Sequence, residues 1–313
     1  MPVNRQVRIG SLKESELAEA DRIVRVAFGT FLGLPNPQGF MDDRNFMTPR
    51  WRSRHVKVIA AREGGRLVGS NVITRWGSFA SFGPLTVLPE YWNRGVAQRL
   101  MESTMTTFEK WGVRHTGLFT FASSPKHVGL YQKFGYWPRS LTAIMTRTPE
   151  SEKAGSQAGS LLSSMDKSCR ERTIEACRRL TGRIDKGLDL SGEIREVLAQ
   201  RTGEIVVTQT RGVPDAFAVC LHGPGSEGGS KTCYIKFAAA RGSEQFVKLL
   251  RACESFAASR NAAIEAGVSM ACESAFRRMR DLGYRTTILG VTMHRPNADG
   301  FTREDTFVLG DWR

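Results

Sequence analysis

Residues 85–100 read Leu-Thr-Val-Leu-Pro-Glu-Tyr-Trp-Asn-Arg-Gly-Val-Ala-Gln-Arg-Leu, and this stretch decides the fold. An apolar run leads up to Pro89, and after Gly95 apolar residues recur at helical spacing, which predicts a strand, a turn and a helix. Such a turn directs free backbone N–H groups and the positive end of a helix dipole at one spot, which suits a diphosphate. Gly95 permits close approach of the backbone, and Arg94 and Arg99 add positive charge. An ordinary strand-turn-helix connection has the same local features, so this stretch alone leaves both interpretations open.

A second stretch, residues 129–136, reads Gly-Leu-Tyr-Gln-Lys-Phe-Gly-Tyr and predicts the end of a short helix. Taken alone, Tyr131 is more simply interpreted as a half-buried tyrosine of a helix. Together, the two stretches resemble the motifs of the GNAT superfamily of N-acetyltransferases, V-x-P followed by Q/R-x-x-G-x-G/A, and then L-Y-x-K-x-G-F/Y. The chain departs from the pattern at Trp92, where the family has Gln or Arg, and at Ser124, where it usually has Asn.

The resemblance implies acetyl-CoA as the cosubstrate, bound along a strand and across the turn that follows it. The backbone of the strand would pair with the pantetheine arm, and the N–H of Val87 would stabilise the oxyanion of a tetrahedral intermediate. Tyr131 would act as the general acid that protonates the departing thiolate. The implied cofactor contacts are Leu85, Thr86, Val87, Trp92, Asn93, Arg94, Gly95, Val96, Ala97 and Ser124.

The general base is not evident from the sequence. Residues 76–89 contain no acid and no histidine, and Ser81 lies near the place where the family often has Glu. A water chain, or an acid from elsewhere such as Asp42 or Asp43, would then remove the proton. These two aspartates are equally well explained as solvated loop residues.

The order of predicted elements indicates two similar halves. Each half ends with strand, long helix, strand, short helix and strand, and Gly135-Tyr136 and Gly283-Tyr284 occupy the same place in the two series. Residues 149–160 contain no large apolar residue, which is typical of a linker. We therefore expect an α/β fold with mixed sheets, made of two GNAT-like folds in tandem: a catalytic domain at 1–148, a linker at 149–160 and a second domain at 161–313.

The second domain is expected to lack the catalytic apparatus. Residues 237–245 keep one glycine of the turn but lack the V-x-P entry, and Glu244 adds a negative charge where a diphosphate would bind. Alignment on the Gly-Tyr pairs sets Met279 opposite Tyr131, and a thioether cannot donate a proton.

Composition narrows the partners. The net charge is +14, and residues 1–150 hold 21 Lys and Arg against 11 Asp and Glu. A basic half fits nucleic acid, an anionic membrane or a phosphorylated ligand, but the charges are dispersed and lack the interleaved aromatics of a nucleic-acid site.

No apolar run approaches the roughly 20 residues of a membrane span, and no secretory signal opens the chain, so the cytoplasm is the expected compartment. The six cysteines and five histidines show no ligand spacing, and no metal site is expected.

The leading interpretation is an acyltransferase that moves acetyl from acetyl-CoA to a primary amine. The alternative is a non-catalytic acyl-CoA sensor or scaffold, against which Tyr131 argues because a sensor needs no proton donor. The acceptor cannot be read from the sequence, although a basic first half disfavours polycationic acceptors. The second half could serve the acceptor side or an oligomer interface.

Overall fold

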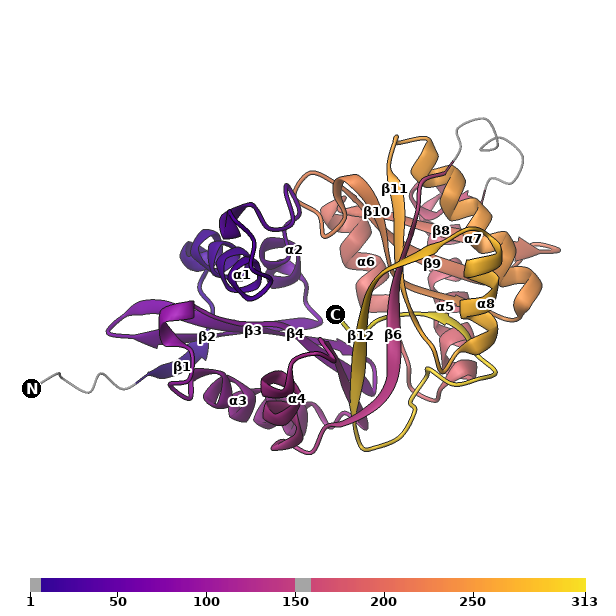
Figure 1. The fold of residues 1–313 in the computed structure, drawn as a ribbon. Helices are drawn as coiled ribbons and strands as arrows, with labels where there is room; N and C mark the ends of the chain where they lie inside the picture. The colour runs from indigo at the N-terminus through magenta and orange to yellow at the C-terminus, as the bar shows by residue number, and fades with distance from the viewer. Residues whose placement is uncertain (1–6, 150–158) are drawn as a thin grey trace, which may run out of the picture.

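A computed structural model describes residues 7–149 and 159–313 of the chain. Most of the predicted linker therefore lies outside the described residues. The strands of both halves belong to a single 13-stranded mixed sheet with helices on its faces, which confirms the predicted α/β class (Figure 1). No helix in the two described ranges is long and apolar enough to span a membrane.

The first half follows the predicted order closely. Helix α1 buries residues at i, i+3 and i+4 spacing, among them Ala20, Ile23 and Val24, which is the pattern of an amphipathic helix on a sheet. Helices α1 and α2 lie on one side of strands β2 to β4, and α3 and α4 lie on the other (Figure 1). The elements are β1 (Arg8–Ser11), η1 (Glu14–Glu16), α1 (Leu17–Phe31), η2 (Pro37–Gly39), α2 (Met47–Arg52), β2 (Val56–Glu63), β3 (Arg66–Trp76), β4 (Phe79–Val87), η3 (Pro89–Tyr91), α3 (Val96–Trp111), β5 (His115–Thr120), α4 (Pro125–Gln132) and β6 (Trp137–Arg147).

The second half repeats this series after two helices of its own. Strand β10 pairs in parallel with β11, as β4 does with β5, and a helix connects each pair. The elements are β7 (Ser160–Leu161), η5 (Leu162–Ser164), α5 (Lys167–Ile184), α6 (Ser191–Gln200), β8 (Gly203–Thr210), β9 (Val213–Gly223), β10 (Gly229–Ala240), α7 (Ser243–Ala258), β11 (Ala263–Ser269), α8 (Glu273–Asp281), β12 (Arg285–Arg295) and β13 (Phe307–Leu309).

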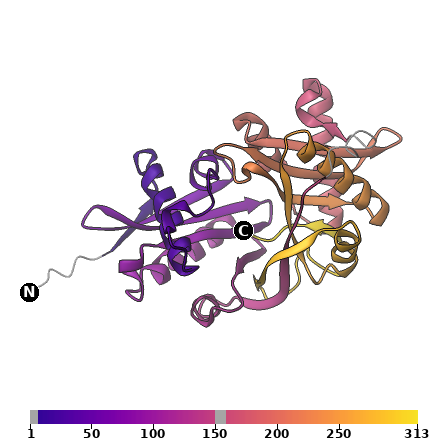
Figure 2. The same ribbon diagram turned by 45° about the horizontal axis from the view of Figure 1, so that its top comes forward.

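The two halves exchange one strand each, β6 of the first and β12 of the second. In the sheet the order is β5-β12-β6-β11, so β12 of the second half lies beside β5 of the first, and β6 of the first lies beside β11 of the second. Strands β6 and β12 run antiparallel to each other between the two halves, as both views show (Figures 1 and 2). Because each half uses a strand of the other, neither 1–148 nor 161–313 contains a complete sheet by itself.

Strand β13 occupies the place in the second half where β10 and β11 separate. Strand β10 pairs with β11 only over Thr232–Ile235, and further along, at Ala238–Ala240, it pairs with β13 instead. On the other side, the N–H of Gly310 donates to the carbonyl of Gly267 in β11, at 3.1 Å. The chain itself therefore fills the separation of this strand pair.

The strand exchange also buries two histidines against each other. His115 of β5 and His294 of β12 have ring centroids 5.0 Å apart, and Trp312 packs against both. Within the described ranges, Nε2 of each histidine and Nε1 of Trp312 are buried without a hydrogen-bond partner. Burial lowers the pKa of His115 to about 3, with a further contribution from His294, and burial lowers the pKa of His294 to about 4.

We therefore expect stability to fall as the pH drops below neutrality. Both histidines stay neutral in the folded chain and take up protons near pH 6.5 once it unfolds, so their contribution is complete above pH 6.5 and is lost as the pH falls toward 4. Between pH 7.5 and 5.5 the two together should lower the free energy of unfolding by about 2–3 kcal/mol. Urea unfolding at the two pH values measures this. His294→Asn, which can still donate to the Ala298 carbonyl but does not titrate, should lose about half of the dependence, and an unchanged dependence would contradict the assignment.

Candidate active site

The turn before α3 has the geometry of an anion cradle. Asn93 and Gly95 both have positive φ, 62° and 77°, and Gly95 is the N-cap of α3. A Cβ built on Gly95 would meet nothing within 4 Å, so the backbone faces open space at this point. The first intrahelical bond runs from the N–H of Arg99 to the carbonyl of Gly95. The N–H groups of Val96 and Ala97 therefore have no intrahelical acceptor and lie at the positive end of the helix dipole.

The side chains of this turn are largely engaged with the protein. Arg94 forms an ion pair with Glu63 at 2.6 Å and stacks over the Tyr91 ring at 4.5 Å. Arg99 donates to the carbonyl of Val7. The attraction of the cradle for an anion therefore comes mainly from backbone N–H groups and less from free arginine charges.

Trp92, the departure from the family pattern, joins the turn to the strand before it. Its indole Nε1 donates to the carbonyl of Val87 at 2.7 Å, and the ammonium of Lys126 lies 5.4 Å from its ring. Lys126 belongs to α4, so Trp92 connects β4, the turn before α3 and the start of α4.

The edge of β4 becomes free where β4 and β5 separate. The two strands pair only over Phe79–Ser81 and His115–Gly117, and none of the described strands pairs with β4 on that side beyond Ser81. We call this place the strand divergence. On its other side β4 pairs with β3. The N–H of Leu88 donates to the carbonyl of Val68, so Leu88 and Val68 form a hydrogen-bonded residue pair of this antiparallel ladder.

Hydrogen-bonded and non-bonded pairs alternate in an antiparallel ladder. The Val87–Gly69 and Leu85–Asn71 pairs are therefore non-bonded, and the N–H and C=O groups of Leu85 and Val87 point toward the strand divergence. Thr86 instead uses its backbone in the ladder with Ser70. This narrows the predicted contacts: Leu85 and Val87 can offer backbone groups to a ligand, but Thr86 can offer only its side chain. That hydroxyl is buried and has no partner among the described residues.

Tyr131 lies beside the strand divergence. It projects from α4, and its ring packs edge-on against Phe82, the first residue of β4 beyond the pairing with β5, with centroids 5.5 Å apart. Its hydroxyl makes no hydrogen bond within the described part of the chain, and burial raises its pKa. Tyr136 packs against Phe82 at the same distance, but its hydroxyl is 2.9 Å from Oγ1 of Thr116. Of these two tyrosines, only Tyr131 has a hydroxyl free to serve a ligand.

Ser124 is the N-cap residue of α4 and is buried. Its side chain makes no capping hydrogen bond. Lys126, two residues further along the chain, contacts the ring of Trp92.

The two aspartates considered as a base are bound to the second half. The carboxylate of Asp43 accepts from the N–H of Ser230 at 3.1 Å and from its hydroxyl at 2.5 Å, and these bonds lower its pKa. Asp42 forms an exposed ion pair with Lys231 at 2.8 Å. Their contacts are those of residues that hold the loop before α2 against the hairpin of β9 and β10.

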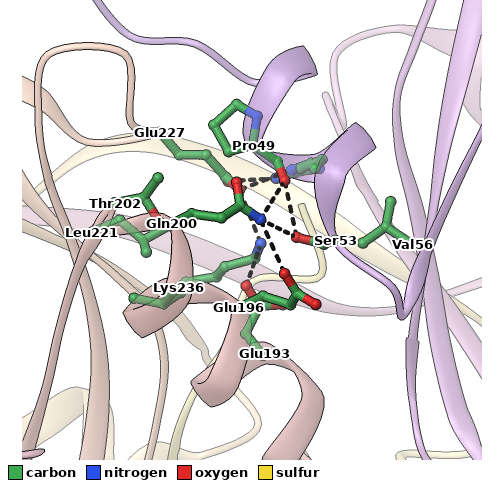
Figure 3. A pocket seen from close by; sticks show the side chains of 12 residues that line it. Pro49, Ser53, Val56, Glu193, Glu196, Gln200, Thr202, Leu221, Glu227 and Lys236 are labelled. Carbon is green, nitrogen blue, oxygen red and sulfur yellow. Dashed lines mark hydrogen bonds and ion pairs between the residues drawn. The ribbon is translucent and has the colours of Figure 1, made fainter. Parts of the chain in front are cut away.

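A pocket between α2 and α6 is occupied by a buried ionic network (Figure 3). Arg50 donates to both oxygens of Glu227, at 2.9 and 2.6 Å, and Lys236 bridges Glu227 and Glu193 at 2.9 and 3.0 Å. Burial disfavours the charged form of Glu227, but Arg50 and Lys236 outweigh it and hold its pKa at about 2. Gln200 lines the pocket and donates hydrogen bonds to the Pro49 carbonyl and the Ser53 hydroxyl, both 3.1 Å. Because its charges are mutually paired, this pocket has a structural role.

The network reaches the strand divergence at one point. Arg50 donates to the carbonyl of Gly83 at 2.6 Å and so fixes β4 just beyond its pairing with β5. Sequence reasoning missed this role, since Arg50 and Glu227 are 177 residues apart and only the tertiary fold pairs them.

Comparison with known proteins gives a family match for part of the chain and a shared fold for the whole of it. Residues 26–136 match the model of the acetyltransferase (GNAT) family. A candidate acetyltransferase from Pyrococcus horikoshii has the same fold over 98% of this chain and 95% of its own, with a TM-score of 0.68 at 11% identity. A GCN5-related N-acetyltransferase from Sphaerobacter thermophilus matches over 96% of this chain and 99% of its own, with a TM-score of 0.59 at 14% identity.

A search of curated proteins found no match. The two solved structures share the fold along the whole chain, and the family match covers the turn before α3, the strand divergence and Tyr131. Residues 26–136 of the chain are therefore similar to the GNAT family of acetyltransferases, and the whole chain shares its fold with the two solved structures.

Proposed function

We propose that the protein is an N-acetyltransferase that moves acetyl from acetyl-CoA to a primary amine by direct attack in a ternary complex. The observation that supports the proposal is the strand divergence: the backbone groups of Leu85 and Val87 point toward it, and the ring of Tyr131 packs on Phe82 beside it. The turn that follows β4 leads into the N-terminus of α3. The diphosphate binds the N–H groups before and at the start of α3, and the pantetheine arm follows the free edge of β4. Ser124 and Thr86 supply side-chain contacts.

The reaction needs one oxyanion donor and one acid. The amine nitrogen attacks the thioester carbon, a C–N bond forms, and the N–H of Val87 stabilises the negative oxygen. When the intermediate collapses the C–S bond breaks, and the thiolate takes the proton of the Tyr131 hydroxyl. The raised pKa of Tyr131 keeps that hydroxyl protonated at neutral pH. The carbonyl of Val87 already accepts a hydrogen bond from Trp92, so its N–H is the backbone group of Val87 that is available to the ligand.

In this mechanism water accepts the proton of the attacking amine. Asp42 and Asp43 are held by Lys231 and Ser230, and Ser81 of β4 is buried. A thiol-release assay with acetyl-CoA and a panel of primary amines tests the proposed activity. The alternative, an acyl-CoA sensor without turnover, is favoured if the protein binds acetyl-CoA tightly and releases no thiol with any amine.

Only the first half is proposed to bind acetyl-CoA. In the second half β13 pairs with β10 where β4 has its free edge, α7 starts after Gly242 in extended conformation, and Met279 of α8 is fully buried. A pantetheine arm would have to displace β13 to reach the same backbone groups.

We expect a stoichiometry of one acetyl-CoA per chain. Isothermal calorimetry on the full chain measures it directly. The same titration on Gly95→Glu provides the control, because a second site in the other half would survive that substitution. A stoichiometry of two, or half of the binding remaining in the variant, would contradict the assignment.

A further inference from the structure

Aromatic side chains gather at the strand divergence on the side of α1. The ring of Phe31, at the end of α1, lies 5.2 Å from that of Phe121, just beyond β5, and 4.9 Å from the imidazole of His127 in α4. Phe119 of β5 lies 6.5 Å from Phe121. We call these four residues the aromatic cluster. It starts two residues beyond Gly117, the last residue of β5 that pairs with β4.

Within the aromatic cluster, Phe119 is held in place by packing, whereas Phe31 is partly exposed. Phe119 packs over Gly290 of β12, where any Cβ would come within 2.3 Å of its ring, so the exchanged strand fixes its position. Phe31 is 36% exposed, and the residues that follow it, Leu32 and Leu34, are 44% and 38% exposed. The apolar surface therefore continues from the strand divergence out along the segment after α1.

The imidazole of His127 adds an uncharged polar group. Its Nδ1 is buried and has no partner among the described residues. Burial lowers the pKa of His127, with a further contribution from Lys126, so the ring is neutral at physiological pH. His127 and Tyr131 are four residues apart on α4 and therefore lie on the same face of the helix.

Four carboxylates of α1, the loop before α2 and β11 are paired within the protein. On α1, Asp21 binds Arg25 at 2.7 Å, and behind α2, Glu265 binds Arg44 and Arg313, each at 3.3 Å. The acids of the loop between them, Asp42 and Asp43, are held by the second half. A polycation would meet apolar side chains and the ammonium of Lys126, whereas an apolar body would find a matching wall.

We propose that the acceptor is an amine carried on an aromatic or aliphatic body, and that the aromatic cluster binds that body while the amine faces Val87 and Tyr131. The proposal rests on the proposed transferase function, since that function defines which ligand is the acceptor. Affinity then comes from apolar contact with Phe31 and Phe121, and the neutral His127 accepts a hydrogen bond from the ligand. The site selects against polyamines because none of the four residues of the aromatic cluster carries a carboxylate that could pair with a second ammonium.

The test uses the full chain saturated with CoA, so that binding is measured without turnover. Two primary amines serve as probes, 2-phenylethylamine and spermidine, and calorimetry gives their affinities. We expect 2-phenylethylamine to bind at least about tenfold more tightly than spermidine, and Phe31→Ala to weaken it by about tenfold, as loss of a buried aromatic contact predicts. Val213→Ala, in an exposed apolar residue of the distant β8–β9 hairpin, is the matched control and should change nothing.

Tighter binding of spermidine, equal binding of the two amines or no binding of either would overturn the proposal. So would an unchanged affinity in Phe31→Ala, or a dimer of the wild-type chain that Phe31→Ala converts to monomer, since Phe31 would then serve an interface. If 2-phenylethylamine binds through Phe31 but receives no acetyl from acetyl-CoA, the aromatic cluster stands as an amine site and the transferase function fails instead.

Discussion

Gly95→Glu should abolish binding of acetyl-CoA, weakening it by at least about 100-fold. The open space in front of Gly95 means that the new side chain would not be excluded by the protein. It would instead enter the place proposed for the diphosphate, block approach to the N–H groups of Val96 and Ala97, and set a negative charge beside the phosphates. Calorimetric titration of the full-length variant with acetyl-CoA measures the loss.

A matched control separates this effect from backbone strain. Gly112, the C-cap of the same helix, also has positive φ, 60°, and also faces open space. Gly112→Glu therefore imposes similar strain but lies at the opposite end of α3, and its affinity for acetyl-CoA should match the wild type. Equal affinities for all three proteins would show that the diphosphate binds elsewhere.

Local periodicity predicted the elements well, and the pairing of strands could not be predicted from it. Helix α3 begins at Val96, directly after Gly95, as the apolar spacing indicated. The repeated strand-helix-strand series is also present in both halves, so the predicted tandem fold is confirmed. The exchange of β6 and β12 was missed, because a strand has the same apolar pattern whichever neighbour it pairs with.

The features of the candidate site also differ in whether local sequence could predict them. The turn at Gly95 and the motif around Tyr131 are local features, and local sequence is enough to predict them. The roles of Arg50 and Asp43 depend on Glu227 and Ser230, which lie far away in the chain. The short strand β13 was missed for a similar reason, since three residues give no periodicity and only β10 explains its position.

Tyr131→Phe should lower kcat by about 100-fold or more while leaving the affinity for acetyl-CoA nearly unchanged. The substitution removes only the hydroxyl, and the ring contact with Phe82 is kept. Without the proton donor the thiolate has to leave as an anion in a desolvated site, which raises the barrier for collapse of the intermediate. Steady-state kinetics with a fixed amine, together with calorimetry for acetyl-CoA, separates the loss of turnover from a loss of binding.

Tyr136→Phe is the control for this experiment, because the two tyrosines share burial and packing on Phe82 but differ in the hydrogen bonding of their hydroxyls. Both are buried, both pack against Phe82 at 5.5 Å, and burial raises the pKa of both. The hydroxyl of Tyr136 is bonded to Thr116, so its removal should cost about 1 kcal/mol of stability and leave kcat within a few-fold of the wild type. A thiolate with a low intrinsic barrier to departure, or a different acid, would give Tyr131→Phe the same kcat as Tyr136→Phe. A deficit confined to Tyr131→Phe would identify its hydroxyl as the proton donor, because packing and burial are common to both variants.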